Sequence, residues 1–359
     1  MGNKTVIPFG PQHPVLPEPI HLDLVLEDET VVEAVPSIGY VHRGLEGLVD
    51  KKDFLQYTYV AERICGICSF MHGMSYCMAV ESIMEVKIPE RAEFLRTIWA
   101  ELSRLHSHTL WLGLLADAFG FESLFMHSWR LRELILDIFE QTTGGRVIFS
   151  VCEIGGVRRD IDSEMLNKIK IEMDKFEKEI SEIINVFIND ESVKHRTMGV
   201  GILSKQAAFE LGAVGPMARA SGISMDMRTQ GYAAYCKLKF EPIIETAGDC
   251  YARTSVRIRE IFQSIDLIRQ CIELIPEGDI NVKIKGNPNG ENFTRVEQPR
   301  GEVLYYVKAN GTKNLDRFRV RTPTFANIPA LLETLKGCAL ADVPILILTI
   351  DPCISCTER

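Results

Sequence analysis

The stretch Arg63-Ile64-Cys65-Gly66-Ile67-Cys68 ends in a C-x-x-C pair, and a second pair ends the stretch Asp351-Pro352-Cys353-Ile354-Ser355-Cys356. This spacing at a loop-to-helix junction points two sulfurs to the same side, close enough to share a metal ion, and the backbone N–H groups there favour the thiolate form. One such pair is a weak signal, whereas two pairs are a stronger one. Because they lie near opposite ends of the 359 residues, a shared site requires that both ends of the chain meet.

The cysteines also admit three plainer interpretations. A structural zinc site with four cysteine ligands has the right number of donors, but zinc modules usually keep their pairs within a few dozen residues. A thioredoxin-type redox pair needs only one motif and a βαβ context, which the sequence does not show. Core thiols are the ordinary interpretation of the six remaining cysteines out of ten, which are Cys77, Cys152, Cys236, Cys250, Cys271 and Cys338.

The composition is that of an ordinary globular protein. Hydrophobic residues make up 46% of the chain and charged residues 25%, which excludes a disordered protein. With 49 acidic and 40 basic residues the net charge is −9, so a nucleic-acid partner is not expected. The first residues show no signal-peptide pattern, and the best apolar run, Val343–Ile350, is far shorter than the roughly 18 residues of a membrane span. We therefore expect the cysteines to lie in a reducing compartment.

Patterns of apolar residues predict a mainly α-helical fold with small β-edges (α+β). Alternating apolar and polar residues at 21–26 and 30–35 predict a β-hairpin over about 20–36. Helical periodicity follows over about 50–275, with buried helices at 90–118 and 123–141. The clearest helix follows Asp160–Ser163, which offers good capping residues. Its apolar seam recurs every three or four positions and comprises Leu166, Ile169, Met173, Phe176, Ile180, Ile183 and Phe187.

The later part of the chain returns to strands. We expect a short helix at 204–211, a loop at 216–231 and a helix at 231–275 that is kinked at Pro242. Strands are expected at 301–307 and 317–320, with an Asn310-Gly311 turn between them, followed by a last helix at 327–337. No repeat or linker divides the chain. We therefore predict a single domain over 1–359, with a β-region at about 280–322 and a metal-binding C-terminal segment at 351–359.

Residues next to the two pairs strengthen the case for a metal site. His72 follows Cys68 by one helical turn, so it is placed to donate to a sulfur; a satisfied core histidine is a close alternative. Asp351-Pro352 restricts the backbone before Cys353 and presents the second pair from a constrained loop. Soft thiolate ligands suit zinc, iron, nickel or copper rather than magnesium.

The two pairs and their surroundings resemble a known family. Arg43-Gly44-Leu45-Glu46 followed by Arg63–Cys68 is similar to the N-terminal signature of nickel–iron hydrogenase large subunits, and Asp351–Cys356 is similar to their C-terminal signature. Further stretches resemble the energy-converting, Ech-type branch, which is related to the quinone-site subunit of respiratory complex I: Gly10–Pro14, Gly39–Arg43 and Thr357–Arg359. Complex I subunits lack the four cysteines. The resemblance implies a hydrogenase large-subunit-like helical bundle with N-terminal and C-terminal β-hairpins.

The resemblance also implies a metal centre. By the family pattern all four sulfurs bind nickel: Cys65 and Cys353 match the terminal ligands, while Cys68 and Cys356 match the ligands that bridge to an iron carrying carbon monoxide and cyanide. Thr324 matches the residue that hydrogen-bonds an iron cyanide. From its local sequence alone, Thr324 is equally well a turn residue after a strand.

Three residues match the family's proton-handling and activating groups. Cys353 is implied as the first proton acceptor when H2 is cleaved, and family spacing places the next acceptor, a carboxylate, at Glu18. Without the resemblance, Glu18 is best interpreted as an ordinary exposed loop carboxylate. Arg300 resembles the arginine held above the open metal position, where a fixed guanidinium polarises bound H2; the plain alternative is a surface arginine in a turn.

One position departs from the family pattern. The counterpart of Glu46 binds a remote magnesium together with a C-terminal histidine in the better-known members. Here the last residue is Arg359, a cation that does not ligate metals readily. Magnesium at Glu46 and a Glu46–Arg359 ion pair are therefore competing hypotheses.

The resemblance implies a catalytic subunit that cleaves H2 and reduces protons. No further cysteine cluster suits an iron–sulfur relay, so a small iron–sulfur partner subunit is required. The Ech-type pattern adds a ferredoxin-like subunit, integral membrane ion-translocating subunits and ferredoxin as the electron partner, with this chain peripheral on the cytoplasmic face. The alternatives are a structural or assembly protein with a four-thiolate zinc site, and a complex I-like quinone-site subunit.

Overall fold

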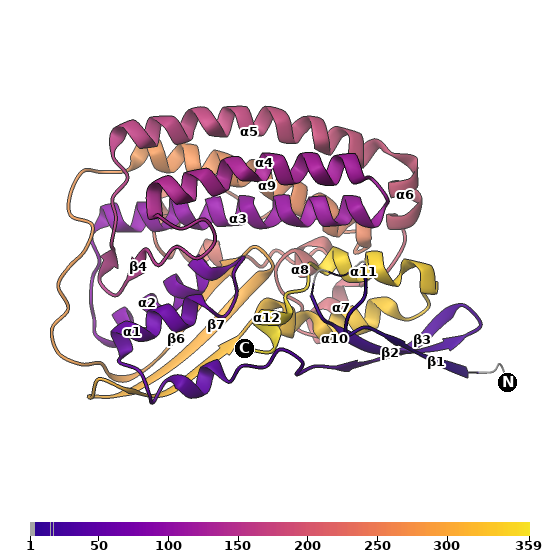
Figure 1. Cartoon of the computed structure of the whole chain (residues 1–359), viewed down its shortest axis with the longest axis horizontal. Coiled ribbons are helices and arrows are strands. Elements are labelled where there is room, and N and C mark those ends of the chain that lie inside the picture. The colour runs from indigo at the N-terminus through magenta and orange to yellow at the C-terminus, as the bar shows by residue number, and fades with distance from the viewer. Residues whose placement is uncertain (1–3, 15, 17) are drawn as a thin grey trace.

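The computed structural model describes residues 4–14, 16 and 18–359. Pro17, which precedes Glu18, lies outside the described residues. Residues 1–3, the start of the segment in which we expect no signal peptide, also lie outside them. A bundle of four long helices forms one side of the molecule (Figure 1). These helices are α3 (Glu90–Ala118), α4 (Glu122–Thr143), α5 (Ser163–Asn189) and α9 (Cys250–Leu274). α3 packs against α4 and α9, and α5 completes the bundle by packing against the same two helices.

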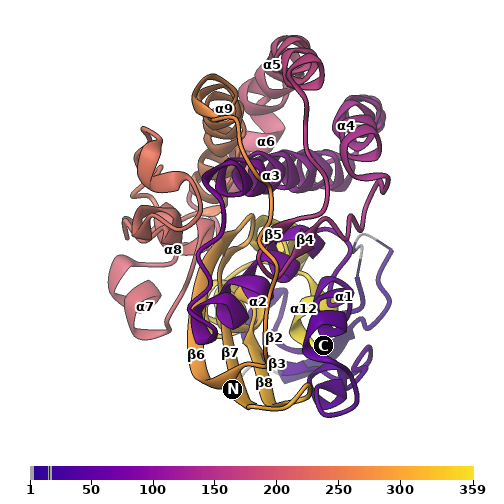
Figure 2. The ribbon, with the colours of Figure 1, turned by 90° about the vertical axis from the view of Figure 1, so that its left-hand side faces the viewer.

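Two antiparallel three-stranded sheets lie on the other side of the bundle (Figure 2). The N-terminal sheet comprises β1 (Lys4–Phe9), β2 (His21–Glu27) and β3 (Thr30–Ser37), and the second sheet comprises β6 (Asn289–Gln298), β7 (Gly301–Asn310) and β8 (Leu315–Arg321). α1 (Phe54–Glu62) packs on α2 (Ser69–Ile83), which covers β6 and β7. β4 (Cys152–Glu153) and β5 (Gly156–Val157) form a small pair beneath α3.

The C-terminal helices lie between the bundle and the sheets. α10 (Pro323–Leu335) contacts β3 and β7, and α11 (Val343–Ile350) contacts α3, α9 and α10. The chain ends in the single turn α12 (Ile354–Thr357). The short helices α6 (Glu191–Thr197), α7 (Lys205–Glu210) and α8 (Pro216–Ala220) join α5 to α9. The chain therefore ends beside α12, next to the strands of the second sheet (Figure 1).

α5 shows how the sequence determines the bundle. The Asp162 side chain accepts a hydrogen bond from Met165 N at 2.8 Å and so begins the helix. All seven residues of the predicted seam are buried, and Asp190 ends α5 while capping α6. Each buried aliphatic or aromatic side chain contributes roughly 1.5–3 kcal/mol, so the seam fixes α5 against its neighbours.

The predicted fold class, mainly α with small β-edges, is confirmed. Each predicted hairpin is part of a three-stranded sheet, because β1 and β6 add strands that the alternation did not reveal. The predicted boundaries of the single domain stay a prediction.

Two predicted elements between residues 216 and 275 are wrong. Residues 231–249 do not continue the helix, which begins only at Cys250. Gly248 adopts φ +68 and packs on the Leu203 carbonyl, and the Asp249 side chain caps Ala252 N at 2.7 Å, so a helix start was signalled there. Conversely, the predicted loop contains α8, which begins with Pro216 at its first position.

A close backbone contact joins α8 to the β6–β7 turn. Gly215 has φ +64, and a Cβ atom built there would lie 2.2 Å from Gly301 Cα and 2.7 Å from the Arg300 carbonyl oxygen. Gly301 has φ +131 and meets Gly215 in return. Only two glycine backbones can approach each other this closely, and the contact fixes the position of the turn that carries Arg300.

We expect Gly215→Ala to destabilise the protein by about 3 kcal/mol, since it combines backbone strain with overpacking at the Arg300 turn. Gly212→Ala is a matched control, because Gly212 has φ +66 but nothing within 4 Å of its built Cβ, and it should cost about 1 kcal/mol. Urea unfolding of the two variants measures the difference. Equal losses would show that the contact with Gly301 does not matter.

Candidate metal centre

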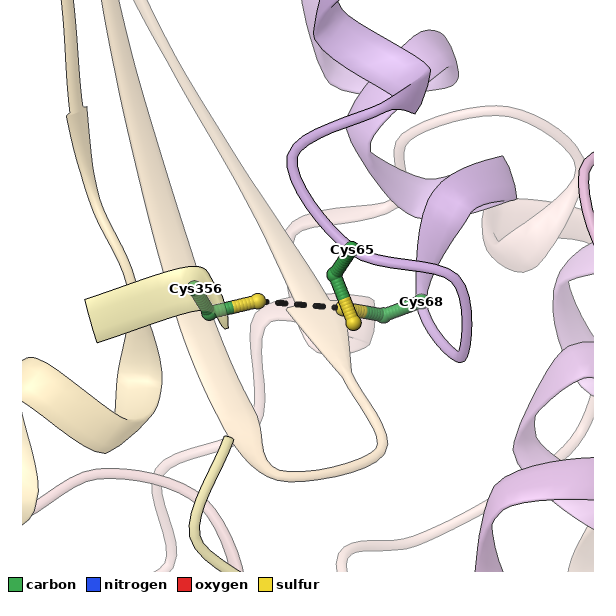
Figure 3. A group of neighbouring side chains, drawn as sticks. All are labelled: Cys65, Cys68 and Cys356. Carbon is green, nitrogen blue, oxygen red and sulfur yellow. Dashed lines mark hydrogen bonds between the residues drawn. The ribbon is translucent and has the colours of Figure 1, made fainter. Parts of the chain in front are cut away.

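The four cysteines of the two C-x-x-C pairs meet inside the protein. Cys65 Sγ lies 3.3 Å from Cys353 Sγ, and Cys68 Sγ lies 3.4 Å from Cys356 Sγ. None of the four is more than 3% exposed. Figure 3 shows Cys65 and Cys68 on the loop before α2, with Cys356 facing them from α12. The sequence prediction that both ends of the chain meet at these pairs agrees with this geometry.

The C-terminal pair is presented by a constrained backbone. Asp351, the residue that follows α11, adopts the left-handed conformation with φ 57 and ψ 63, which costs a non-glycine residue about 1 kcal/mol or more. Thr324 Oγ1 accepts the Cys353 N–H at 3.0 Å, and Thr322 donates to the Cys356 carbonyl at 3.0 Å. Thr324 therefore positions a cysteine through its backbone; its predicted contact with an iron ligand stays a prediction.

The thiols form an electrostatically coupled set. Burial raises the pKa of Cys68, but hydrogen bonds from the other three thiols outweigh it and hold this pKa well below the ordinary value. Burial and the same neighbours hold the pKa of Cys356 well above its ordinary value. One thiolate thus suppresses ionisation of its partners, since like charges at this distance repel strongly. A cation is needed for all four to ionise, and Cys65, Cys68 and Cys356 offer sulfurs within 4.8 Å of one another. This donor set fits a soft metal ion.

His72 is placed beside the sulfurs from α2. Its Nε2 lies 3.3 Å from Cys356 Sγ, and its Nδ1 lies 2.5 Å from the Tyr305 hydroxyl on β7. The ring is completely buried. The helical spacing from Cys68 thus brings His72 to Cys356, a cysteine of the second pair. The hydrogen bond between Tyr305 and the other ring nitrogen fixes the orientation of the imidazole.

Arg300 reaches the centre from the β6–β7 turn. Its Nε donates to the Asp351 carbonyl and its Nη2 to Asp351 Oδ1, both at 2.8 Å, while Nη1 lies 3.5 Å from Ser107 Oγ on α3. Burial lowers the pKa of Arg300, but Asp351 and the cysteine sulfurs raise it well above the ordinary value, so the guanidinium stays charged. Arg300 is only 4% exposed, which excludes the surface-arginine alternative. Sequence reasoning missed Ser107, which carries no motif.

Glu18 lies over the start of α12. Its Oε2 accepts hydrogen bonds from Ile354 N and from Ser355 N, the latter at 3.0 Å. These N–H groups belong to the two residues that follow Cys353, so the carboxylate lies beside the C-terminal pair rather than free in a loop. Glu18 also lines a surface pocket of about 370 Å³, together with Pro11, Gln12, His13, Pro14, Leu16 and Pro19.

Glu46 lies in an ion-pair cluster. Its Oε1 accepts from Val320 N at 2.9 Å and from Arg359 Nε at 3.0 Å, and its Oε2 accepts from Arg319. Burial raises the pKa of Glu46, but the Arg319, Val320 and Arg359 hydrogen bonds outweigh it and leave this pKa below the ordinary value. With both oxygens bound to guanidinium groups, Glu46 is a poor ligand for magnesium. The geometry favours the Glu46–Arg359 pair.

The loop after β3 holds the C-terminal turn in place. Glu358 accepts hydrogen bonds from Gly39 N at 2.6 Å and from Val41 N, while its carbonyl lies 2.8 Å from His42 Nδ1. Arg43 donates to the carbonyls of Ile64 and Ser355, at 2.7 and 3.0 Å, and so joins the two cysteine stretches directly. The sequence offered no local signal for the role of Glu358, because its partners lie more than 300 positions away.

Comparison with known proteins identifies the family. The family described as "Respiratory-chain NADH dehydrogenase, 49 Kd subunit" matches residues 118–287 and 282–359, and "Nickel-dependent hydrogenase" matches residues 43–117. The chain is 40% identical to the carbon monoxide-induced hydrogenase of Rhodospirillum rubrum, covering 98% of this chain and 99% of the relative. It is 39% identical to membrane-bound hydrogenase subunit alpha of Pyrococcus furiosus, covering 98% and 87%.

A solved structure agrees with the sequence relatives. A chain of the membrane-bound sulfane sulfur reductase, an archaeal respiratory membrane complex, superposes with a TM-score of 0.95 at 30% identity, covering 99% of both chains. The protein belongs to the family that unites nickel–iron hydrogenase large subunits with the 49 kDa subunit of respiratory NADH dehydrogenase, in its energy-converting, Ech-type branch. Within the described residues no helix is both long and apolar enough to cross a membrane.

We expect the purified protein to hold no stoichiometric magnesium at Glu46. Glu46→Gln should leave the magnesium content unchanged and destabilise the protein by about 1 kcal/mol at neutral pH through loss of the half-buried ion pairs. Because folding lowers the pKa of Glu46, this contribution is present above the ordinary pKa of 4.5 and is lost as the pH falls through the folded value. Metal analysis, together with unfolding of both proteins at neutral pH and at a pH below the folded-state pKa of Glu46, provides the test. Bound magnesium that disappears in Glu46→Gln would contradict the expectation.

Proposed function

We propose that this chain is the catalytic subunit of a nickel–iron hydrogenase that cleaves H2 heterolytically and reversibly. The observation that carries the proposal is the meeting of four buried cysteines from the two ends of the chain, with Sγ separations of 3.3 and 3.4 Å. Their family, and the hydrogenase names of the Rhodospirillum and Pyrococcus relatives, support it.

In this proposal the cysteines hold the metals in the roles that the family pattern gives them. Cys65 and Cys353 are terminal nickel ligands, and Cys68 and Cys356 also bind an iron that carries carbon monoxide and cyanide. When bound, the nickel–iron centre supplies soft, low-valent metals that polarise H2 and accept its two electrons. The low pKa of Cys68 favours a thiolate at one of the two positions assigned to bridging ligands.

The protein's own groups would orient H2 and carry its proton. Arg300 holds a fixed positive charge beside the thiols because Asp351 binds it through both side chain and backbone. Cys353 Sγ receives the proton first, and the Glu18 carboxylate receives it next. The hydrogen bonds from Ile354 N and Ser355 N to Glu18 keep the acceptor next to the donor.

Electrons would leave through partner subunits. Among the described residues, the only metal-binding group is made of cysteines of this centre, so we infer a small iron–sulfur subunit packed nearby. A ferredoxin-like subunit, integral membrane ion-translocating subunits and ferredoxin complete the proposed assembly, with this chain peripheral on the cytoplasmic face. The names of the Pyrococcus relative and of the archaeal respiratory membrane complex support a membrane-bound assembly.

A second candidate function is a complex I-like quinone-site subunit. The 49 kDa family matches residues 118–287 and 282–359, most of the helical bundle and all of the C-terminal region, and favours this candidate. A quinone-site role has no use for the buried four-thiol set, which favours the hydrogenase. A four-thiolate zinc protein would use the thiols, but it gives no reason for the buried Arg300–Asp351 pair.

We expect the purified complex to contain nickel and iron and to show infrared bands in the carbon monoxide and cyanide stretching region. Cys65→Ser and Cys356→Ser should lose nickel, and Cys271→Ser is the matched control, since Cys271 is equally buried but lies in α9. Zinc alone would establish the structural alternative. Intact metals without the infrared bands would overturn the hydrogenase proposal.

We expect Arg300→Lys to lower H2/D2 exchange by a factor of about 10² to 10³, because a lysine cannot make the paired hydrogen bonds that fix the guanidinium. Nickel content and the infrared bands should stay as in the wild type. Arg295→Lys is the control: Arg295 lies on the same hairpin but pairs with Glu302 and is half-exposed. Wild-type exchange at background level would favour the quinone-site candidate, and unchanged exchange in Arg300→Lys would remove Arg300 from the mechanism.

A further inference from the structure

A second group of charges is buried next to the turn that carries Arg300. We call it the ionic cluster: it joins α3, α8, α9, the loop after α8 and β6, and none of its members is more than 1% exposed. Its members are Glu101, Arg104, His108, Arg219, Asp226, Arg228, Glu260 and Glu297. The roles proposed above for the metal centre use none of them.

Hydrogen bonds tie the ionic cluster together. Arg219 donates to Glu260 Oε1 at 2.6 Å and to Glu297 Oε1 at 2.7 Å. Arg228 donates to Asp226 at 2.8 Å and lies 3.4 Å from Glu101. Further bonds run from Arg104 to Glu101 at 3.2 Å and between His108 Nε2 and Glu260 at 2.9 Å.

The charges of the ionic cluster do not balance. Four carboxylates are hydrogen-bonded to three guanidinium groups, so one negative charge is left over within this bonded set if every carboxylate ionises. A further buried guanidinium, Arg257 on α9, acts on Glu260 but donates, among the described residues, only to backbone carbonyls. An uncompensated charge in a dry interior is expensive, and a buried group takes up a proton instead. The cluster therefore has one position for a proton, either on His108 or on a carboxylate.

His108 is not that position. Its Nε2 faces Glu260, whereas its Nδ1 has no hydrogen-bond partner among the described residues, so a second ring proton would have nothing to bind. Burial lowers the pKa of His108 despite the neighbouring Glu260. The histidine is therefore neutral, donates through Nε2 and leaves the extra negative charge on the carboxylates.

Among the carboxylates, Glu297 has the weakest support for its charge. Asp226 is bound by Arg228 through both oxygens. Glu101 receives hydrogen bonds from Ser264 and Tyr235 besides its arginines. Glu260 is bound by Arg219 at one oxygen and by His108 at the other. Glu297 is bound by Arg219 and by Met227 N, and Arg219 Nη1 also lies 3.6 Å from Asp226. Burial, with repulsion from Asp226, raises the pKa of Glu297 to about 7.

We propose that Glu297 binds an exchangeable proton, which makes the ionic cluster a proton-holding site next to the turn that carries Arg300. The protonated acid leaves the cluster neutral, and release of the proton leaves one negative charge with no electron transferred. Gln263 accepts from Arg228 at 2.9 Å and is itself part-exposed, so the cluster has a polar route to the surface. The proton-holding site is independent of which metal the cysteines bind.

The site is connected to Arg300 by backbone and helix. Arg104 donates to the carbonyls of Glu297 and Gln298 at 2.9 and 3.2 Å, two residues that precede the Arg300 turn. α3 carries both His108 and Ser107, which lies against Arg300. The Gln298 side-chain amide is buried with neither polar atom bound within the described part of the chain, a further sign of a polar interior at this point. A change of charge at Glu297 therefore acts close to Arg300.

The charged and titratable groups that face Glu297 come from several elements. They are Arg104 on α3, Arg219 on α8, Asp226 and Tyr232 in the segment after α8, Glu260 on α9 and Arg295 on β6 itself. The Tyr232 hydroxyl accepts a hydrogen bond from Glu297 N. On the neighbouring strand Glu302 pairs with Glu297 in register, but Arg295 and Arg321 bind both of its oxygens. Glu302 is as deeply buried and has its charge compensated, which makes it a matched control.

Infrared spectroscopy of the purified complex tests the proposal. We expect a carboxylic acid C=O band that shifts in D2O and fades as the pH rises through about 7, the folded-state pKa of Glu297. The band should be lost in Glu297→Gln, kept in Glu302→Gln and His108→Gln, and moved in frequency in Glu297→Asp. The wild-type titration and Glu297→Asp decide the question even where Glu297→Gln does not assemble.

Several results would overturn the proton-holding site. They are a wild type with no titrating acid band, a band that survives in Glu297→Gln, and a band that disappears in His108→Gln. Failure here is distinguishable from failure of the hydrogenase proposal, which is tested by carbon monoxide and cyanide bands in a different region of the same spectrum.

Discussion

The structure depends on one contact, between cysteines from the two ends of the chain. Four thiols packed at 3.3 and 3.4 Å cannot all ionise without a cation, so binding of a metal ion would be coupled to the closure of the chain. The protein alone still directs this closure, because Arg43 joins the two cysteine stretches and Glu358 binds the loop after β3. The fold thus brings the sulfurs together, and the metal would remove their mutual repulsion.

The sequence predicted what local patterns encode and missed what distant contacts decide. The apolar seam of α5 follows from periodicity and its start from the Asp162 cap, and α3 begins directly after Pro89; all of these are local properties. The prediction of a helix from residue 231 was wrong because apolar residues there pack without helical structure. The sequence analysis missed β6 because the exposed half of this strand carries mostly polar residues on both faces. The cysteine pairs were found because their spacing is itself a local signal, whereas Ser107 and Glu358 act only through tertiary contacts.

The C-terminal arginine illustrates how one residue changes the chemistry of a nearby carboxylate. Glu46 sits where a carboxylate could meet a divalent ion, but Arg359 and Arg319 occupy both of its oxygens. A guanidinium provides the neutralising charge and directed hydrogen bonds without needing a metal's full ligand set. The connection between the C-terminus and η1 (Leu45–Leu48) is therefore made by side chains alone, and it persists whatever the supply of magnesium.

The interior behind the centre is polar where an apolar core would be more stable. Burying ions costs free energy that their mutual attraction seldom offsets, so the ionic cluster is poorly explained by stability. Its geometry suggests a different reason. Arg104 binds the carbonyls of Glu297 and Gln298 next to the Arg300 turn, and the contact of Gly215 with Gly301 fixes the position of that turn. An apolar core would leave those carbonyls without donors and let Arg300 drift from Asp351. The buried charges thus hold one guanidinium beside the sulfurs, and the unbalanced carboxylate that remains becomes a place for a proton.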